Sequence, residues 1–151
     1  MWRAASLLFV FLVTAACSHY KNISFPVAAP PTITGSVFYK TAAAMAWQQR
    51  DSFAVKEILS GNVPSFLKKF VAVKTSITDS LTGNIIQATY YVSPDYLSIG
   101  SDDDWARVDL TPMGAQKIAD SLHCFLPARK MVDDIYKASV VKTEPVPMYA
   151  F

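Results

Sequence analysis

The chain has 151 residues, of which 52% are hydrophobic and 13% aromatic, and its 14 basic and 12 acidic side chains give a formal net charge of +2. This length is enough for one domain with a real hydrophobic core. A charge so close to neutral argues against nucleic acid or an anionic membrane surface as the main partner, and two cysteines are too few for a disulfide scaffold.

The first seventeen residues have the layout of a bacterial lipoprotein signal. Arg3 precedes an apolar run over residues 4–13, which is shorter than the roughly 20 residues that span a membrane and fits the core of a cleavable signal. Two alanines then precede Cys17, the residue we expect to carry the lipid after cleavage. Thr14 departs from the Leu, Val or Ile that this signal usually has three positions before the cut. A plain secretory signal cleaved after Ala16 and an uncleaved anchor are the alternatives.

If Cys17 is acylated, the protein is expected to be held at a membrane. Two or more acyl chains anchor a protein firmly, whereas a single chain is marginal. Because Ser18 rather than Asp follows the cysteine, we expect the outer membrane, with the protein facing the periplasm. Cys124 then has no disulfide partner, although a Cys17–Cys124 disulfide is the alternative.

The expected organisation is a signal peptide over 1–16, a flexible tether over 17–34 and a single α+β domain over 35–151. The tether is polar and then rich in proline and small residues, without helical or strand periodicity. Apolar spacing predicts helices over 44–60 and 128–139, a short helical turn over 65–70, and a helix that begins at Thr111-Pro112. Alternating patterns predict strands over 71–78, 85–92, 96–99 and 106–110, the first two forming an antiparallel hairpin. The fold class is therefore α+β, a small antiparallel sheet with three to four helices.

Three consecutive aspartates, Asp102, Asp103 and Asp104, form the densest acidic group. A calcium loop needs ligands at alternating positions and a later Glu, which this stretch lacks. We therefore expect a solvated turn in which Asp104 caps, and in which Asp103 pairs with Arg107. The functional alternative is that the three carboxylates line a ligand cleft.

His123-Cys124 and Arg129 are the other candidates for chemistry. A cysteine nucleophile needs a histidine within reach of its sulfur, and two adjacent residues at a helix end diverge. A buried structural Cys124 is the favoured interpretation, and two N/S ligands are too few for zinc. Arg129 and Lys130 lie four residues before Asp133 and Asp134, which predicts two ion pairs on a helix. The alternative role of Arg129 is the anchor of a groove that binds a carboxylate ligand or a peptide.

Three stretches together are similar to a family of secreted or lipid-anchored bacterial envelope proteins without an established activity. They are VSPDYLSIGSDDD at 92–104, LTPM with AQKIAD over 110–120, and LPARKMVDDIY at 126–136. The resemblance implies a shared fold and an envelope location. Members of that family continue past this point into a segment with histidine-containing motifs, which implies that the domain is truncated at its C-terminus. The alternative is a native C-terminus at Phe151 that ends in a strand docked on the domain.

The sequence thus predicts a lipid-anchored envelope protein that binds a cell-envelope component or a partner protein, with no cofactor or metal. Its contact with the membrane is expected to be the lipid. The alternative is the N-terminal part of a secreted hydrolase that acts on cell-wall or similar polymers, with the 102–104 loop and Arg129 lining its cleft.

Overall fold

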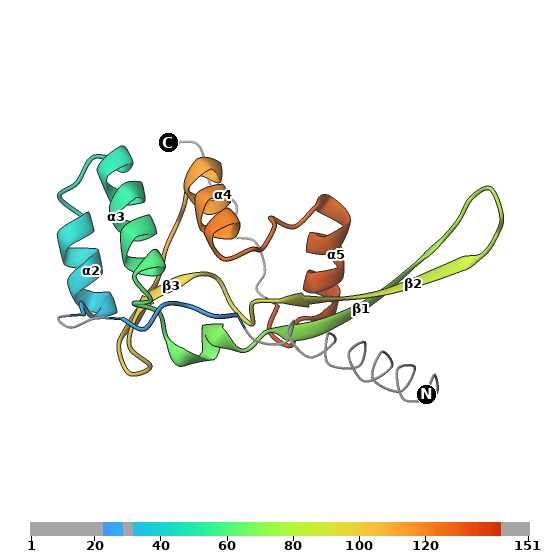
Figure 1. Ribbon diagram of the computed structural model, residues 1–151, viewed down its shortest axis with the longest axis horizontal. Coiled ribbons are helices and arrows are strands. Elements are labelled where there is room, and N and C mark those ends of the chain that lie inside the picture. Colours follow the sequence, from blue (N-terminus) through green and yellow to red (C-terminus); the bar gives the residue numbers. More distant parts are fainter. Residues whose placement is uncertain (1–22, 29–31, 143–151) are drawn as a thin grey trace, which may run out of the picture. The chain divides into compact units, whose positions relative to one another are not determined.

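The computed structural model describes residues 23–28 and 32–142 (Figure 1). The expected signal peptide, Cys17 and the C-terminal extended segment beyond residue 142 lie outside these residues. The elements in chain order are α2 (Gly35–Ala42), α3 (Trp47–Leu59), the 3₁₀ turn η2 (Ser65–Lys68), β1 (Val71–Thr78), β2 (Ile85–Val92), β3 (Ser98–Gly100), β4 (Trp105–Arg107), α4 (Pro112–Ser121) and α5 (Arg129–Ala138). The expected α+β fold with small antiparallel sheets is confirmed.

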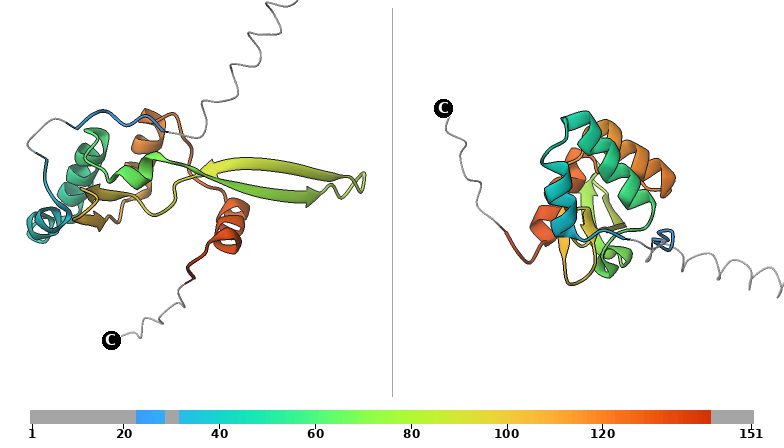
Figure 2. Two further views of the ribbon diagram at one scale, coloured as in Figure 1. Left: turned by 90° about the horizontal axis from the view of Figure 1, so that it is seen from below. Right: turned by 90° about the vertical axis from the view of Figure 1, so that its left-hand side faces the viewer.

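The chain divides into two compact units, where the sequence predicted a single domain over 35–151. Among the described residues, the first unit contains those up to 72 together with 91–126, and the second contains 73–90 together with 127–142. The first therefore includes α2, α3, η2, β3, β4 and α4, and the second includes most of the β1–β2 hairpin and all of α5. Figure 2 shows the same elements from two further sides.

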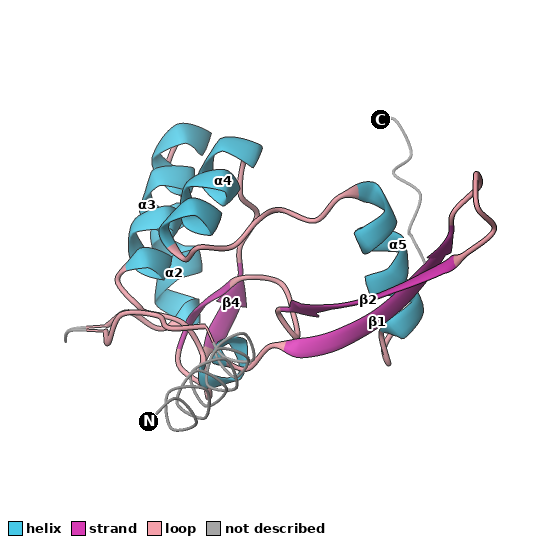
Figure 3. Cartoon of the chain, turned by 45° about the vertical axis from the view of Figure 1, so that its right-hand side comes forward, coloured by secondary structure: helices cyan, strands magenta, loops and turns pink. Residues whose placement is uncertain are grey.

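The first unit is built around an apolar core between its helices and the β3–β4 pair. β3 and β4 are antiparallel, with Ile99 opposite Ala106. Helices α2, α3 and α4 all contribute to this core (Figure 3). Its buried side chains are Phe25, Phe38, Ala42, Ala54, Val55, Ile58, Val63, Leu67, Ile99, Ala106 and Ile118.

The expected tether over 17–34 is wrong for its described part. Phe25 is buried in the core, and Ile23 and Ile33 pack against it. The Ile23 amide also donates a hydrogen bond to the Lys68 carbonyl. Proline and small residues gave this segment no periodic pattern, but apolar residues spaced irregularly along an extended chain still bury their surface.

Helix α3 ends in a Schellman motif at Gly61, directly after the predicted helix over 44–60. The amides of Gly61 and Asn62 donate to the carbonyls of Ile58 and Glu57, and Gly61 has φ of 85°. The Asn62 side chain is buried and its amide nitrogen donates to the Ile33 carbonyl at 3.0 Å and to Glu57 at 2.9 Å. Asn62 therefore joins the end of α3 to the segment that leads into α2.

Helix α4 begins at the predicted Thr111-Pro112 start, with Thr111 as N-cap and its hydroxyl accepting from the Gly114 amide. Asp51 of α3 accepts from the Thr111 amide at 2.8 Å and from its hydroxyl at 3.0 Å. A Cβ on Gly114 would lie 2.7 Å from this carboxylate, so only glycine leaves room for it. A carboxylate on one helix thus holds the start of another.

One helix was not predicted, and the bounds of several other elements differ from the predicted ones. Helix α2 was not predicted, and α3 starts at Trp47 rather than at residue 44. The strands β3 and β4 have three residues each, shorter than predicted, whereas β1 and β2 match their predicted bounds. Helix α2 escaped prediction because its sequence, GSVFYKTA, begins with Gly-Ser and contains β-branched residues.

In the second unit, β1 and β2 form a two-stranded antiparallel hairpin and α5 packs against it. The hairpin closes through the Asp79 amide, which donates to the Asn84 carbonyl at 2.8 Å. The Tyr90 hydroxyl donates to the Met131 carbonyl of α5 at 3.3 Å. No residue of α5 is buried, although Met131 and Ile135 are half-buried.

We predict that Gly61→Ala destabilises the protein by more than 3 kcal/mol, measured by urea unfolding followed by circular dichroism. The positive φ alone costs roughly 1 kcal/mol for alanine, and the added Cβ would lie 1.9 Å from the Pro26 carbonyl oxygen, so the backbone must move. Gly83→Ala is the control, because Gly83 has φ of 71° and a Cβ there meets no atom within 4 Å. Equal losses in the two variants would contradict the close approach at Pro26.

Candidate functional site

The three-aspartate loop lies between β3 and β4, and two of its carboxylates cap the starts of other elements. Asp104 accepts from the Ser36 amide at 2.9 Å and from the Ser36 hydroxyl at 3.0 Å, at the first turn of α2. Its backbone carbonyl accepts from the Gly35 amide at 2.9 Å. Asp102 accepts from the Ser65 amide, at the start of η2, at 2.6 Å. The capping role expected for Asp104 is confirmed.

These contacts explain the charge state of the loop. Hydrogen bonds from the Thr34 side chain and the Ser36 amide lower the pKa of Asp104. Hydrogen bonds from the Ser65 side chain and amide lower the pKa of Asp102. Both carboxylates are stabilised in their charged form by donors that belong to the ends of helical elements, where the helix dipole also favours negative charge. One carboxylate oxygen of each residue, Oδ1, thus accepts from donors of the protein itself.

Two glycines allow the loop to approach α2 this closely. A Cβ on Gly35 would lie 2.3 Å from the Trp105 carbonyl carbon. A Cβ on Gly100, which has φ of 120°, would lie 2.3 Å from the Asp104 carbonyl oxygen and 2.7 Å from the Gly35 nitrogen. The backbones of the loop and of the helix start are therefore in direct contact, without side chains between them.

The expected Asp103–Arg107 pair is not formed. Arg107 instead makes a bidentate contact with Asp95, through Nε at 3.2 Å and Nη2 at 2.7 Å. The Arg107 guanidinium lowers the pKa of Asp95. It also lies over the Trp105 ring, 5.2 Å from its centroid. Asp95 was not predicted, because its partner is twelve residues away and only the pairing of β3 with β4 brings them together.

His123 and Cys124 form the end of α4. The amides of Cys124 and His123 donate to the carbonyls of Ala119 and Asp120, which is a second Schellman motif with His123 at φ of 54° in the position that glycine usually takes. Cys124 is a free thiol in the described part of the chain, and burial raises its pKa. A nucleophilic cysteine needs a lowered pKa, so this thiol has the character of a structural residue.

Arg129, the proposed groove anchor, is the first residue of α5 and is exposed. Its predicted partner Asp133 makes no ion pair with it in the described residues, whereas Lys130 pairs with Asp134 at 2.8 Å as predicted. Arg129 belongs to the second unit and the 102–104 loop to the first.

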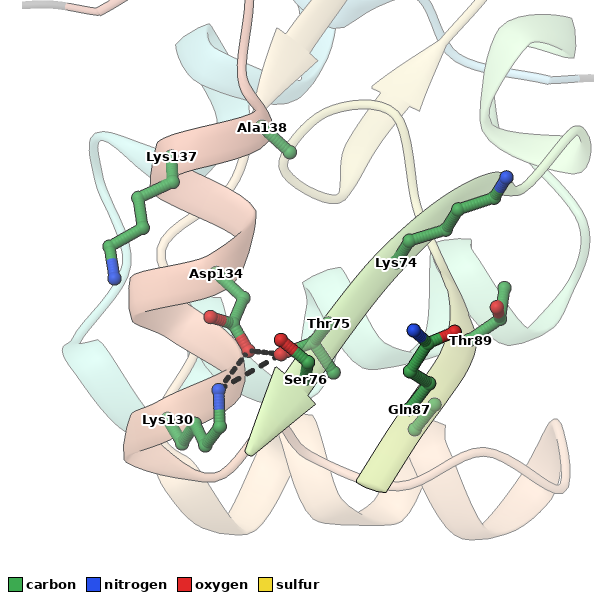
Figure 4. A pocket seen from close by; sticks show the side chains of 10 residues that line it. Lys74, Thr75, Ser76, Gln87, Thr89, Lys130, Asp134, Lys137 and Ala138 are labelled. Atoms are coloured by element: carbon green, nitrogen blue, oxygen red, sulfur yellow. Dashed lines mark hydrogen bonds and ion pairs between the residues drawn. The ribbon is translucent and has the colours of Figure 1, made fainter. Parts of the chain in front are cut away.

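The second unit contains an open groove of about 950 Å³ that is lined by residues of β1, β2 and α5 (Figure 4). Its polar lining comes from both strands and from the helix: Lys74, Thr75, Ser76, Gln87, Thr89, Lys130, Asp134 and Lys137. Three lysines and one aspartate give this lining a net charge of +2. The sequence gave no signal for it, because each contributing residue is an ordinary exposed position of a strand or helix.

A hydrogen-bonded triad holds one wall of the groove. The Thr75 hydroxyl donates to Asp134 at 2.7 Å, and the Lys130 ammonium donates to Thr75 at 2.9 Å and to Asp134 at 2.8 Å (Figure 4). Hydrogen bonds from Lys130 and then from Thr75 lower the pKa of Asp134. The triad neutralises Lys130, so Lys74 and Lys137 are the lining cations without an ion pair among the described residues.

Comparisons with protein-family models, with curated proteins and with solved structures found no match for the chain. The resemblance to a bacterial envelope family therefore stays a prediction. Within the described residues, no helix combines the length and apolar character needed to cross a bilayer. Over the same residues, no three His, Cys, Asp or Glu side chains lie together as a metal ion would require.

We predict that Asp104→Ala lowers the melting midpoint by about 4–8 °C, the shift typical for one lost helix cap. Asp103→Ala is the matched control, because the Asp103 side chain makes no hydrogen bond within the described residues. Since the pKa of Asp104 is lowered in the folded state, its contribution is present above the ordinary aspartate pKa and is lost as the pH falls through the folded value. The gap between the two variants should therefore close in acid. A similar loss in both variants at neutral pH would contradict the capping role.

Proposed function

We propose that the protein is a lipid-anchored protein of the bacterial cell envelope that binds an anionic, hydroxyl-rich glycan of the cell wall through the groove of its second unit. The observation that carries the proposal is the lining of this groove. Cationic, hydroxyl and amide side chains alternate along it, and its apolar lining is limited to Ala88 and Ala138.

The chemistry of the lining suits this class of ligand. Lys74 and Lys137 supply positive charge for carboxylate or phosphate groups, as point charges that do not require one fixed geometry. Ser76, Gln87 and Thr89 supply donors and acceptors for sugar hydroxyls. The triad of Thr75, Lys130 and Asp134 fixes the wall that a ligand would contact. An open groove, in contrast to an enclosed pocket, also admits a polymer that continues at both ends.

The anchor follows from Cys17, whose acylation would hold the protein at the membrane while the folded units face the wall. The outer membrane, with the protein in the periplasm, is the proposed location because Ser18 follows the cysteine. The membrane contact in this proposal comes from the lipid, in agreement with the small net charge of the chain.

Metabolic labelling with a palmitate analogue tests the anchor. We expect label on the full chain, and we expect Cys17→Ala to remove it and to release the protein into the soluble fraction. Cys124→Ala is the control, since the other cysteine should not affect labelling. An unlabelled chain, or label that survives Cys17→Ala, would overturn the lipid assignment.

Binding to isolated cell-wall material tests the groove. The double variant Lys74→Gln, Lys137→Gln should lose most of its retention, and the retention of the unchanged protein should fall as salt increases, because exposed charges are screened. The control, Lys56→Gln with Lys117→Gln, removes the same charge from exposed positions of α3 and α4. Equal retention by the two double variants would exclude the groove as the binding site.

A further inference from the structure

The strand β2 has an edge that favours pairing with another strand. Within the described residues its sheet contains only β1 and β2, so each strand has one side that no neighbouring strand covers. The sequence of β2, IIQATYYV, has no charged residue and no proline, and it is rich in β-branched and aromatic residues. Charges and prolines are the usual means by which edge strands avoid such pairing.

The second unit also buries very little of its own apolar surface. Among its described residues, Val73 alone is buried. Ile77, Ile85 and Ile86 of the hairpin are between 53% and 68% exposed, and Val132 and Tyr136 of α5 are 50% and 57% exposed. A two-stranded hairpin with one helix is marginal in water, and three or more strands with a covered apolar face are needed for stability.

We infer that β2 pairs edge to edge with β2 of a second copy of this chain, in the antiparallel direction. The uncharged sequence of β2 favours a second copy as the pairing partner, because pairing two β2 strands brings no like charges together. The β1 edge carries Lys74, and Lys130 of α5 bonds to Thr75 on that strand. This inference does not rest on the proposed function.

The register follows from the alternation of side chains. Thr75 and Tyr90 both contact α5, so β1 residues 73, 75 and 77 and β2 residues 86, 88 and 90 share the face toward the helix. Two identical antiparallel strands place residues of one face opposite one another, and one residue at the centre faces its own copy. Centring the pair on Ala88 puts Ile86 opposite Tyr90 of the second copy, a favourable β-branched and aromatic pair.

The product is a four-stranded antiparallel sheet with both α5 helices on one face. The exposed Ile86 side chains of both copies then lie on the face that carries the helices. The opposite face carries Lys74, Ser76, Gln87 and Thr89 of both copies. A two-fold axis relates the two halves, which is the commonest symmetry of soluble homodimers.

Cysteine cross-linking of the full chain tests this arrangement, in a Cys124→Ser background. Ala88→Cys places two thiols directly opposite one another at the axis, within the distance range of a disulfide, and we expect mild oxidation to yield mainly a disulfide-linked dimer. Ser76→Cys, an exposed position of β1, should give several-fold less. The Cys124→Ser background alone controls for any contribution of Cys17. Stronger cross-linking through Ser76→Cys, or none through Ala88→Cys, would overturn the inference.

A charge at the same position provides an independent test. Ala88 is exposed within the copy, so Ala88→Lys should leave the circular dichroism spectrum unchanged. In the dimer it would place two ammonium groups opposite one another, which disfavours the pairing. We expect the unchanged full chain to sediment as a dimer in non-ionic detergent, the Ala88→Lys variant as a monomer and Ala88→Val as a dimer. A monomeric unchanged chain, or a dimeric Ala88→Lys variant, would exclude β2 pairing.

Discussion

The contact between the β3–β4 loop and the start of α2 is the constraint on which the first unit depends. It joins segments 68 residues apart through the Asp104 carboxylate and carbonyl, which accept three donors from Gly35 and Ser36. The donors at a helix start have no partners within the helix, and in an apolar setting they must find acceptors elsewhere. Gly35 and Gly100 leave the space in which this happens. Helix α2 is thereby fixed on the core, although its own sequence has little preference for a helix.

Other aspartates of the first unit also accept hydrogen bonds from the backbone at the start of a helical element. Asp102 holds the start of η2, and Asp51 holds the start of α4. Asp95 serves the sheet in a similar way by fixing Arg107 beside Trp105. Four aspartates are thus engaged by the protein's own donors. The polar groove in the second unit has a different character, because most of its side chains are directed to solvent and only the Thr75 triad is internally bonded.

Local patterns allowed much of this structure to be predicted. The hairpin strands follow from alternation, the end of α3 follows from the apolar spacing, and the start of α4 follows from Thr111-Pro112. Helix α2 and the burial of Phe25 depend on acceptors and apolar surfaces supplied by distant segments, which no local window contains. The groove was missed for a similar reason: Lys74 and Lys137 each occupy a common kind of position, and only the fold of the second unit makes both part of the lining of one groove. Asp102 and Asp104 were identified as candidates, but their surroundings make them caps.

The second unit is assembled from two segments that the chain separates. Its hairpin ends with β2 at Val92 and α5 begins at Arg129, with a large part of the first unit between them. During synthesis the hairpin therefore emerges well before α5. Its apolar face remains uncovered until β3, β4 and α4 of the first unit have been synthesised. Synthesis adds about 5–20 residues per second, so this interval is long compared with the roughly 1–10 microseconds in which a hairpin forms. The order of segments thus places the completion of the second unit after that of the first, and in this interval the apolar side chains of the hairpin are available to other unfolded chains.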